Sequence, residues 1–272
     1  MKVKSLINQV KDVDYFVLRR IMEYVLNISC KEYIIKQEQE LTNEQVKIFL
    51  EFVNDARNGK PVQYITHSQE FFGENFYVDE NVLIPQPDTE IAVEETLKII
   101  SNSNKEKLDI LDLCTGSGAI AISIKRAFNK KTNITASDIS LKALEVAKKN
   151  ANVILKDKNA INFIKSDMFE NIDKKFDIIV TNPPYIETET IKHLSKEVQK
   201  EPKIALDGGE DGLKFYKKIK EHVKNYLNKN GFLIMEIGYN QKENITKMFK
   251  NSKCIKDYCN NDRVIIWKNA VS

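Results

Sequence analysis

From about residue 88 onward, short apolar runs alternate with helical patterns, and this alternation limits the possible folds more than any other feature of the chain. A helix is predicted over residues 89–100. The predicted strands that follow lie near residues 108–113, 134–138, 161–165, 176–180, 232–237 and 263–267. Strands that are separated by helices form a mainly parallel sheet covered on both faces. The sequence therefore predicts an α/β fold for this part of the chain.

The first 74 residues have a different pattern, which is typical of a small helical bundle. Apolar residues between 17 and 26 recur at helical spacing, and Thr42 with Gln45 predicts a capping box at the start of a second helix. Residues 75–87 are then predicted to form a β-hairpin, with strands over 76–78 and 82–84. The predicted organisation is an N-terminal helical domain over 1–74, a hairpin connector over 75–87 and a catalytic domain over 88–272.

The predicted strand at 108–113 leads into a glycine loop with the sequence CTGSG and then into an apolar helix. Gly116 and Gly118 allow a tight turn, and this strand, turn and helix resemble the first unit of a nucleotide-binding sheet. Asp138 follows twenty residues after Gly118, at the end of the next predicted strand, where it can accept hydrogen bonds from ribose hydroxyls. The loop alone does not distinguish a nicotinamide cofactor from S-adenosyl-L-methionine.

A second motif follows the apolar run at 176–180. Its residues 182–185 are Asn-Pro-Pro-Tyr, which we call the amide cradle. Two successive prolines fix the backbone and remove two donors, so the oxygens of Asn182 and Pro183 are available to accept. With the flat face of Tyr185, these acceptors suit a planar NH2 group. A proline-rich turn that only ends a strand is the alternative interpretation.

The order of these motifs favours methyl transfer. Ligands of open α/β sheets bind beyond the carboxyl ends of the strands, so the glycine loop, Asp138 and the amide cradle should lie at one edge. A nucleoside cofactor that is bound by the glycine loop and Asp138 then has its reactive end near the amide cradle. A cradle for an amide nitrogen helps a sulfonium methyl donor and gives no benefit to a hydride carrier.

Over nearly its whole length the chain resembles the HemK/PrmC family, the peptide chain release factor N5-glutamine methyltransferases. The matching blocks are residues 63–90, 112–122, 166–169, 181–186, 201–216 and 231–241. Asn-Pro-Pro-Tyr is shared with adenine-N6 DNA methyltransferases and some guanine-N2 RNA methyltransferases. The block at 63–90 is much more specific to protein glutamine methylation, and its Pro-Asp-Thr-Glu resembles the release-factor branch more than the ribosomal-protein relative.

The resemblance implies a Rossmann-like class I methyltransferase sheet with a seventh strand near 254–259 and an N-terminal module that grips the protein substrate. It also implies S-adenosyl-L-methionine as cofactor, S-adenosyl-L-homocysteine as product, and class-1 release factors as partners, methylated on the glutamine of the Gly-Gly-Gln loop. The predicted catalytic residues are Asn182, Pro183 and Tyr185, and these with Pro184 form the predicted substrate site. The predicted cofactor site comprises Cys114, Thr115, Gly116, Ser117, Gly118, Asp138, Asp167, Met168 and Asn182.

Three positions depart from the family pattern. Gln86 stands where relatives usually have Arg, and Met168 stands where several have an aromatic residue beside the adenine. Cys114 stands where the first loop glycine is common, and a small side chain fits there if φ is negative. Asp167 is equally well interpreted as a loop cap.

Composition indicates a cytoplasmic enzyme without a metal. No run approaches the ~18–20 apolar residues of a membrane span, and the N-terminus lacks the apolar core of a signal peptide. The four cysteines and three histidines are scattered, so neither a disulfide framework nor a metal site is indicated. Residues 1–74 have 10 Lys and Arg against 11 Asp and Glu, and the rest has 32 against 28. No concentrated basic face is indicated, so we do not expect direct binding of nucleic acid. We also expect the chain to be a monomer.

Four other interpretations remain open. An adenine-N6 DNA methyltransferase or a ribosomal-protein glutamine methyltransferase would use the same amide cradle. The DNA enzyme normally needs a sizeable DNA-reading domain, which 74 slightly acidic residues hardly supply. A nicotinamide oxidoreductase would need a hydride acceptor site, and a non-catalytic module would bind the cofactor without turnover.

Overall fold

The computed structural model describes residues 1–270, which form two compact units. The first unit contains Met1–Ser68 together with Leu194–Lys200, and the second contains Gln69–His193 and the chain from Glu201 onward. The chain therefore passes from one unit to the other after Ser68, after His193 and after Lys200. Within these 270 residues, no helix combines the length and the apolar character that crossing a bilayer demands.

The first unit is a helical bundle, as predicted. Its helices are α1 (Val3–Gln9), α2 (Tyr15–Leu26), α3 (Cys30–Ile35), α4 (Asn43–Arg57) and α5 (Val62–Thr66). The predicted capping box starts α4, because Thr42 Oγ1 accepts from the Gln45 amide at 3.2 Å and Gln45 Oε1 accepts from the Thr42 amide at 2.9 Å. After α4 ends, Gly59 adopts a φ of 81° beside the inserted segment 194–200, where an added Cβ would lie 2.9 Å from Lys196 Cβ.

The hairpin lies earlier in the chain than predicted. Strands β1 (Gln69–Phe71) and β2 (Glu74–Phe76) pair antiparallel across Phe72 and Gly73, whose φ angles are 50° and 76°. A two-residue turn with two positive φ angles matches the twist of a hairpin. The prediction of a hairpin over 75–87 is therefore wrong: the second strand ends at Phe76, and residues 77–86 contain no strand. The predicted domain boundaries after residues 74 and 87 stay predictions.

The second unit is built on a seven-stranded sheet in the order β5-β4-β3-β6-β7-β9-β8. Its strands are β3 (Leu108–Leu113), β4 (Thr132–Asp138), β5 (Ile161–Lys165), β6 (Phe176–Thr181), β7 (Leu227–Glu236), β8 (Lys253–Lys256) and β9 (Asp262–Lys268). Among these strands β9 runs opposite to the other six, so it pairs antiparallel with both β7 and β8, while the remaining pairs are parallel. The parallel sheet and the seventh strand are confirmed. The chain order reverses between β3 and β6, which is where ligands bind in such sheets.

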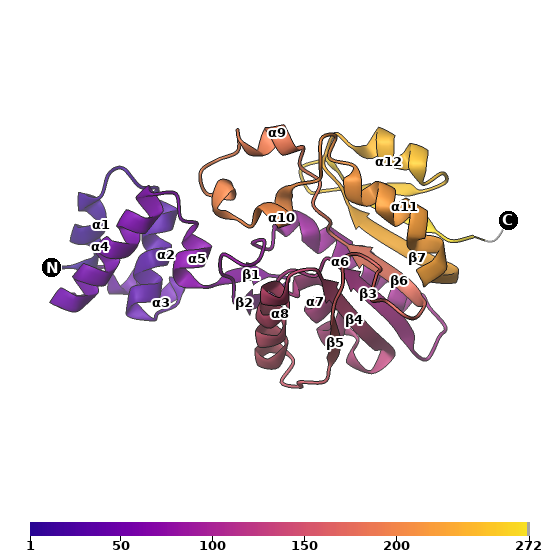
Figure 1. Ribbon diagram of the computed structural model, residues 1–272. Helices are drawn as coiled ribbons and strands as arrows, with labels where there is room; N and C mark the ends of the chain where they lie inside the picture. Colours follow the sequence, from indigo (N-terminus) through magenta and orange to yellow (C-terminus); the bar gives the residue numbers. More distant parts are fainter. Residues whose placement is uncertain (271–272) are drawn as a thin grey trace. The chain divides into compact units, whose positions relative to one another are not determined.

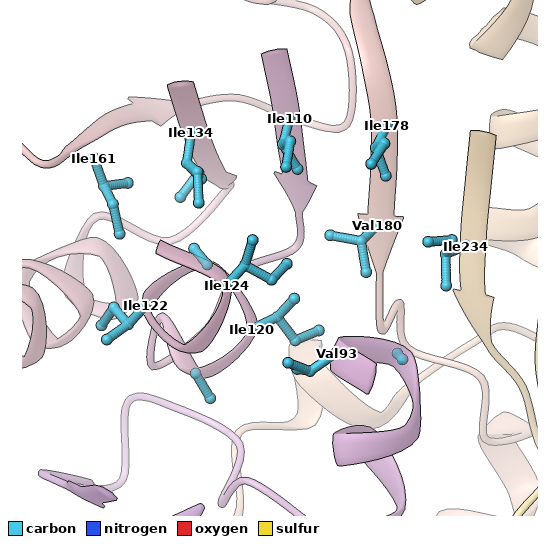
Figure 2. Packing of buried hydrophobic residues seen from close by; sticks show 14 of the residues in the cluster. Val93, Ile110, Ile120, Ile122, Ile124, Ile134, Ile161, Ile178, Val180 and Ile234 are labelled. Carbon is cyan, nitrogen blue, oxygen red and sulfur yellow. The ribbon is translucent and has the colours of Figure 1, made fainter. Parts of the chain in front are cut away.

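Helices cover both faces of this sheet (Figure 1). On one face lie α6 (Glu90–Ser101), α7 (Ala119–Ala127) and α8 (Leu141–Ile154), and on the other lie α11 (Lys214–Tyr226) and α12 (Lys242–Met248). Successive strand residues point to opposite faces, so Ile110 packs under α7 while Leu111 packs toward α11. Figure 2 shows the first of these cores, where strand isoleucines such as Ile134 and Ile178 face Ile124 and Ile120 of α7. The short helices α9 (Thr188–Ile191) and α10 (Lys203–Leu206) lie between β6 and α11 in the chain.

Candidate active site

The central strands end level with one another. Leu113 and Thr181, the last residues of β3 and β6, are in register, and they pair with Ser137 of β4 and Met235 of β7, each of which lies one residue before the end of its strand. The next residue of each strand or loop therefore lies at one carboxyl edge of the sheet: Cys114, Asp138, Asn182 and Glu236. This register places the glycine loop, the acidic residue and the amide cradle along one edge, as the sequence predicts.

A cavity of about 220 Å³ opens at this edge, within the second unit. Most of the predicted site residues line it: Cys114, Thr115, Gly116, Ser117, Asp138, Asp167, Met168, Asn182 and Pro184. Gly118, Pro183 and Tyr185 are not among its lining residues. The structure thus brings the predicted cofactor loop and Asn182 of the cradle together around one space.

The glycine loop has a defined shape because two of its residues adopt positive φ. Gly116 has a φ of 54° and Gly118 a φ of 83°. An added Cβ on Gly118 would lie 2.9 Å from Ile122 Cδ1 and 3.1 Å from Ala147 Cβ, so glycine is needed there for close packing of the helices. Gly116 has open space instead, and its amide donates to Asp138 Oδ2 at 2.9 Å.

Two carboxylates hold this loop by hydrogen bonds. Asp138 Oδ1 also accepts from the Ser140 amide at 2.9 Å, and burial raises the pKa of Asp138. Asp112, which is fully buried on β3, accepts from Thr115 Oγ1 at 2.6 Å and from the Ala121 amide at 3.1 Å. Burial raises the pKa of Asp112 to about 7. The sequence pattern does not single out Asp112, although it lies only two residues before Cys114, the first residue of the loop.

The backbone of the amide cradle is held by a later glycine segment. The Gln241 side chain donates to the Tyr185 carbonyl at 3.0 Å, and the Ile186 carbonyl accepts from the Gly208 amide at 2.8 Å. An added Cβ on Gly208 would lie 2.7 Å from Tyr185 Cα, and one on Gly212 would lie 2.5 Å from the Tyr185 carbonyl. Glycines in the 201–216 block therefore allow two chain segments to approach as closely as they do.

The side chains of the cradle differ in their surroundings. Asn182 Nδ2 donates to Thr89 Oγ1 at 3.2 Å, and Pro184 faces the cavity. The Tyr185 hydroxyl donates to Glu236 Oε1 at 3.3 Å, and burial raises the pKa of this phenol. The arrangement suits a site that binds a nucleoside against the glycine loop and Asp138 and presents its other end to the amide of Asn182.

Comparison with known proteins identifies the family. The PrmC N-terminal domain matches residues 9–66, and the methyltransferase small domain matches residues 94–210. Release factor glutamine methyltransferase from Fusobacterium nucleatum is 38% identical over 100% of this chain and 76% of its own length. The protein of the same name from Clostridium acetobutylicum is 36% identical over 98% of this chain and 95% of its own length. The chain belongs to the release factor glutamine methyltransferase family.

Solved structures agree on the fold. A methyltransferase from Pyrococcus furiosus covers 82% of this chain and 99% of its own with a TM-score of 0.55 at 17% identity. The hMettl16 catalytic domain, solved with a MAT2A 3'UTR hairpin, covers 79% of this chain and 84% of its own with a TM-score of 0.59 at 15% identity. The chain is an S-adenosyl-L-methionine-dependent methyltransferase with the class I fold, and both predictions are confirmed.

Several wall residues of this methyltransferase were not selected from the sequence. The cavity is lined by Asn81, Val82, Leu83, Pro85 and Gln86 and by Pro202, Ile204 and Ala205, so the 187–210 region contributes to the site. Glu201 Oε2 accepts from the Ile84 amide at 2.9 Å and joins these two wall segments. Helix α11 adds Lys214, Phe215 and Lys218, and Lys218 Nζ lies 3.4 Å from Asp167 Oδ1. The partners in these pairs are far apart in sequence, and no local spacing indicates them.

Cys114 corrects a prediction. Its φ is 64°, so the negative φ on which a side chain was expected to fit does not occur. The thiol lies 3.8 Å from Met168 Sδ at the cavity wall, and burial raises its pKa. The backbone of this loop requires the left-handed conformation that glycine adopts most easily, and the cysteine is accommodated in spite of its Cβ.

This strain predicts an unusual order of stabilities. At a position with negative φ, alanine is more stable than glycine by about 0.5–1 kcal/mol. At position 114 we expect the reverse, with Cys114→Gly more stable than Cys114→Ala by about 1–2 kcal/mol, because only the alanine keeps a Cβ in the left-handed region. Urea unfolding of the two variants measures the difference. An alanine variant as stable as the glycine variant would contradict strain at Cys114.

Proposed function

We propose that this chain transfers the methyl group of S-adenosyl-L-methionine to the side-chain nitrogen N5 of the glutamine in the Gly-Gly-Gln loop of class-1 peptide chain release factors. The observation that supports this most is the position of Asn182 and Pro184 on the same cavity as the glycine loop and Asp138. The relatives from Fusobacterium nucleatum and Clostridium acetobutylicum are named for this activity.

The cavity has groups that fit each part of the cofactor. The backbone of Thr115 to Ser117 is proposed to hold the methionine end, and Asp138, which lines the cavity, is proposed to accept from the ribose hydroxyls. Asp167 and Met168 are proposed to lie near the adenine, where the thioether covers one face. The bound cofactor supplies a methyl group on a positively charged sulfur.

The cradle residues are proposed to aim the substrate amide. An amide nitrogen is a poor nucleophile because its lone pair is delocalised into the carbonyl. The oxygens of Asn182 and Pro183 grip the two N–H groups and orient the nitrogen, and these hydrogen bonds strengthen as positive charge develops there. Holding both reactants in one geometry supplies much of the remaining acceleration. Tyr185 packs on the amide plane, and the proton of the methylated nitrogen is lost to water.

Further parts of the proposal concern partners. The helical domain over 1–74 grips the release factor, the enzyme acts as a monomer in the cytoplasm, and it does not bind nucleic acid directly. The mixed charge of residues 1–74, with 10 basic and 11 acidic side chains, supports a protein partner over DNA.

The substrate is tested with a release factor in which the loop glutamine is replaced by alanine. We expect tritium from labelled cofactor to enter the unmodified release factor and not the alanine variant, because the variant has no amide nitrogen to accept it. Scintillation counting and mapping of the labelled peptide measure this. Ribosomal proteins and duplex DNA are counted in parallel, and label in either of them without label in the release factor would overturn the proposal.

A further inference from the structure

Glu236 is a buried carboxyl group directly behind the amide cradle. It ends β7, it is 2% exposed, and it lies level with Asn182 because Thr181 and Met235 are in register. Its Oε2 accepts from Thr89 Oγ1 at 2.6 Å, and its Oε1 accepts from the Tyr185 hydroxyl at 3.3 Å. One carboxylate is therefore connected to both ends of the Asn-Pro-Pro-Tyr motif.

The bond from Thr89 to Glu236 determines which atoms of Asn182 face Thr89. A threonine hydroxyl has one hydrogen, and at 2.6 Å from a carboxylate oxygen that hydrogen is donated to Glu236. Thr89 Oγ1 then has only lone pairs left for Asn182, 3.2 Å away, so the group that faces it must be the NH2 of the amide. The other end of the amide, Oδ1, is left to accept from another partner.

We propose that Glu236 and Thr89 are positioning residues that hold the Asn182 amide in the one orientation in which Oδ1 can accept an N–H of the substrate glutamine. This rests on the proposed function, because it assigns the substrate amide as the donor to Oδ1. A flipped Asn182 would present its own NH2 to the substrate NH2, and two donors do not form a hydrogen bond. In this scheme each acts through Asn182 or Tyr185: Glu236 does not line the cavity, and Thr89, which does, orients the Asn182 amide.

The charge of Glu236 matters to this chain of hydrogen bonds. The groups that face it come from four elements: Asp88 and Thr89 before α6, Tyr185 after β6, Tyr216 on α11 and Arg263 on β9. Burial raises the pKa of Glu236 to about 7, against the opposing effects of the Thr89 bond and of Arg263. Below that pH the protonated acid can donate to Thr89, which frees the threonine hydrogen to face Asn182 and favours the flipped amide. Activity is therefore expected above pH 7 and lost as the pH falls through this value.

The first test compares Thr89→Val with Thr89→Ser. Valine has the shape of threonine without the hydroxyl, so it releases the Asn182 amide, and kcat for release factor methylation should fall by roughly 10- to 100-fold with KM little changed. Serine keeps the hydroxyl and should keep most of the activity. A valine variant with the kcat of the unmodified enzyme, or a serine variant as slow as valine, would overturn the proposal.

The second test is the pH profile of Glu236→Gln. A carboxylate offers an oxygen to each of the two hydroxyls, but a carboxamide has an oxygen at only one of these two positions and an NH2 donor at the other. We expect a slower enzyme whose kcat has lost its fall below pH 7. Glu201→Gln is the matched control, because Glu201 is another buried carboxyl with a pKa raised to about 7 that bonds a backbone amide instead of the cradle. The Glu201→Gln variant should still lose kcat as the pH falls below 7. The proposal would be contradicted if Glu236→Gln showed the same loss of kcat, or if only Glu201→Gln were free of it.

A measurement without substrate separates this inference from the proposed function. With 15N-asparagine labelling, the side-chain NH2 signal of Asn182, identified by its loss in Asn182→Ala, should shift in Thr89→Val and stay near its original position in Thr89→Ser. Cofactor affinity by calorimetry and the melting temperature show that each variant is folded. A release factor that takes no label from the unmodified enzyme would reject the proposed function alone. An Asn182 signal that is the same in the valine variant would reject the inference alone. If Glu236→Gln does not fold, the comparison of Thr89→Val with Thr89→Ser still tests the inference.

Discussion

Replacing Asn182 with alanine is expected to abolish release factor methylation while cofactor affinity stays close to that of the unmodified enzyme. Asn182 provides an acceptor at the cavity, and removal of one hydrogen-bonding group that acts mainly in the transition state typically costs about 10²–10³-fold in rate. The glycine loop and Asp138, which are proposed to hold most of the cofactor, are not altered. Single-turnover transfer of tritium measures the rate, and calorimetry measures the affinity.

The matched control for this variant is Asn133→Ala. Asn133 is an exposed asparagine on β4, and its side chain lies near Asp109 instead of the cavity. We expect its rate to be unchanged, so a loss in both variants would indicate a general effect of asparagine removal. Near-normal methylation by Asn182→Ala would reject the role of Asn182, and a large loss of cofactor affinity would place it in the cofactor site instead.

Replacing Asp138 with alanine is expected to weaken cofactor binding by roughly 1–3 kcal/mol, or about 5- to 150-fold, because charge-assisted partners are then left unmade. The substitution also removes the acceptor of the Gly116 and Ser140 amides, so the glycine loop loses an anchor. Asp138→Asn keeps one acceptor oxygen without the charge, so its affinity for the cofactor should lie between those of the unmodified enzyme and Asp138→Ala. Calorimetric titration with S-adenosyl-L-methionine gives the affinity of each variant.

Asp157→Ala is the control for loss of local structure. Asp157 accepts from the Asn159 amide at 2.9 Å in a similar two-residue turn, but it is exposed and does not line the cavity. This variant should bind the cofactor normally. Unchanged affinity in Asp138→Ala would contradict the ribose assignment, and equal weakening in Asp157→Ala would attribute the effect to turn stability.

The carboxyl edge of the sheet was predictable because its residues follow directly after apolar runs. Once Leu113 and Val180 are assigned to buried parallel strands, the positions of the glycine loop, Asp138 and Asn182 follow from the geometry of such sheets. The apolar runs are short-range patterns, and the rule that ligands bind at the carboxyl ends of parallel strands applies to all such sheets. The cofactor loop and the amide cradle therefore could be assigned to one site without coordinates.

The errors came from backbone conformations that residue type does not reveal. Phe72 and Cys114 both adopt positive φ, which is uncommon for residues with a Cβ. Phe72 is followed directly by Gly73, and Cys114 lies two residues before Gly116; both glycines also have positive φ. At Phe72 this produces a turn that the sequence does not signal, so the hairpin was predicted too late in the chain. Tertiary packing, and not local preference, determines both conformations.

The support behind the cradle was missed for another reason. Thr89 and Glu236 are 147 residues apart in the chain, and each has an ordinary local explanation as a helix-start threonine and a strand-end glutamate. Only the sheet register brings Glu236 beside Asn182. Hydrogen-bond chains of this kind depend on distant elements, and a single sequence contains no spacing that indicates them.

The segment Leu194–Lys200 belongs to the helical unit although both of its flanks belong to the other one. A chimaera that exchanges the helices with those of a relative should therefore exchange this heptapeptide as well, because Lys196 packs so closely on Gly59 that a Cβ at position 59 would lie 2.9 Å from Lys196 Cβ. For the same reason, expression of residues 69–272 alone would leave the heptapeptide without the surface on which it is seated.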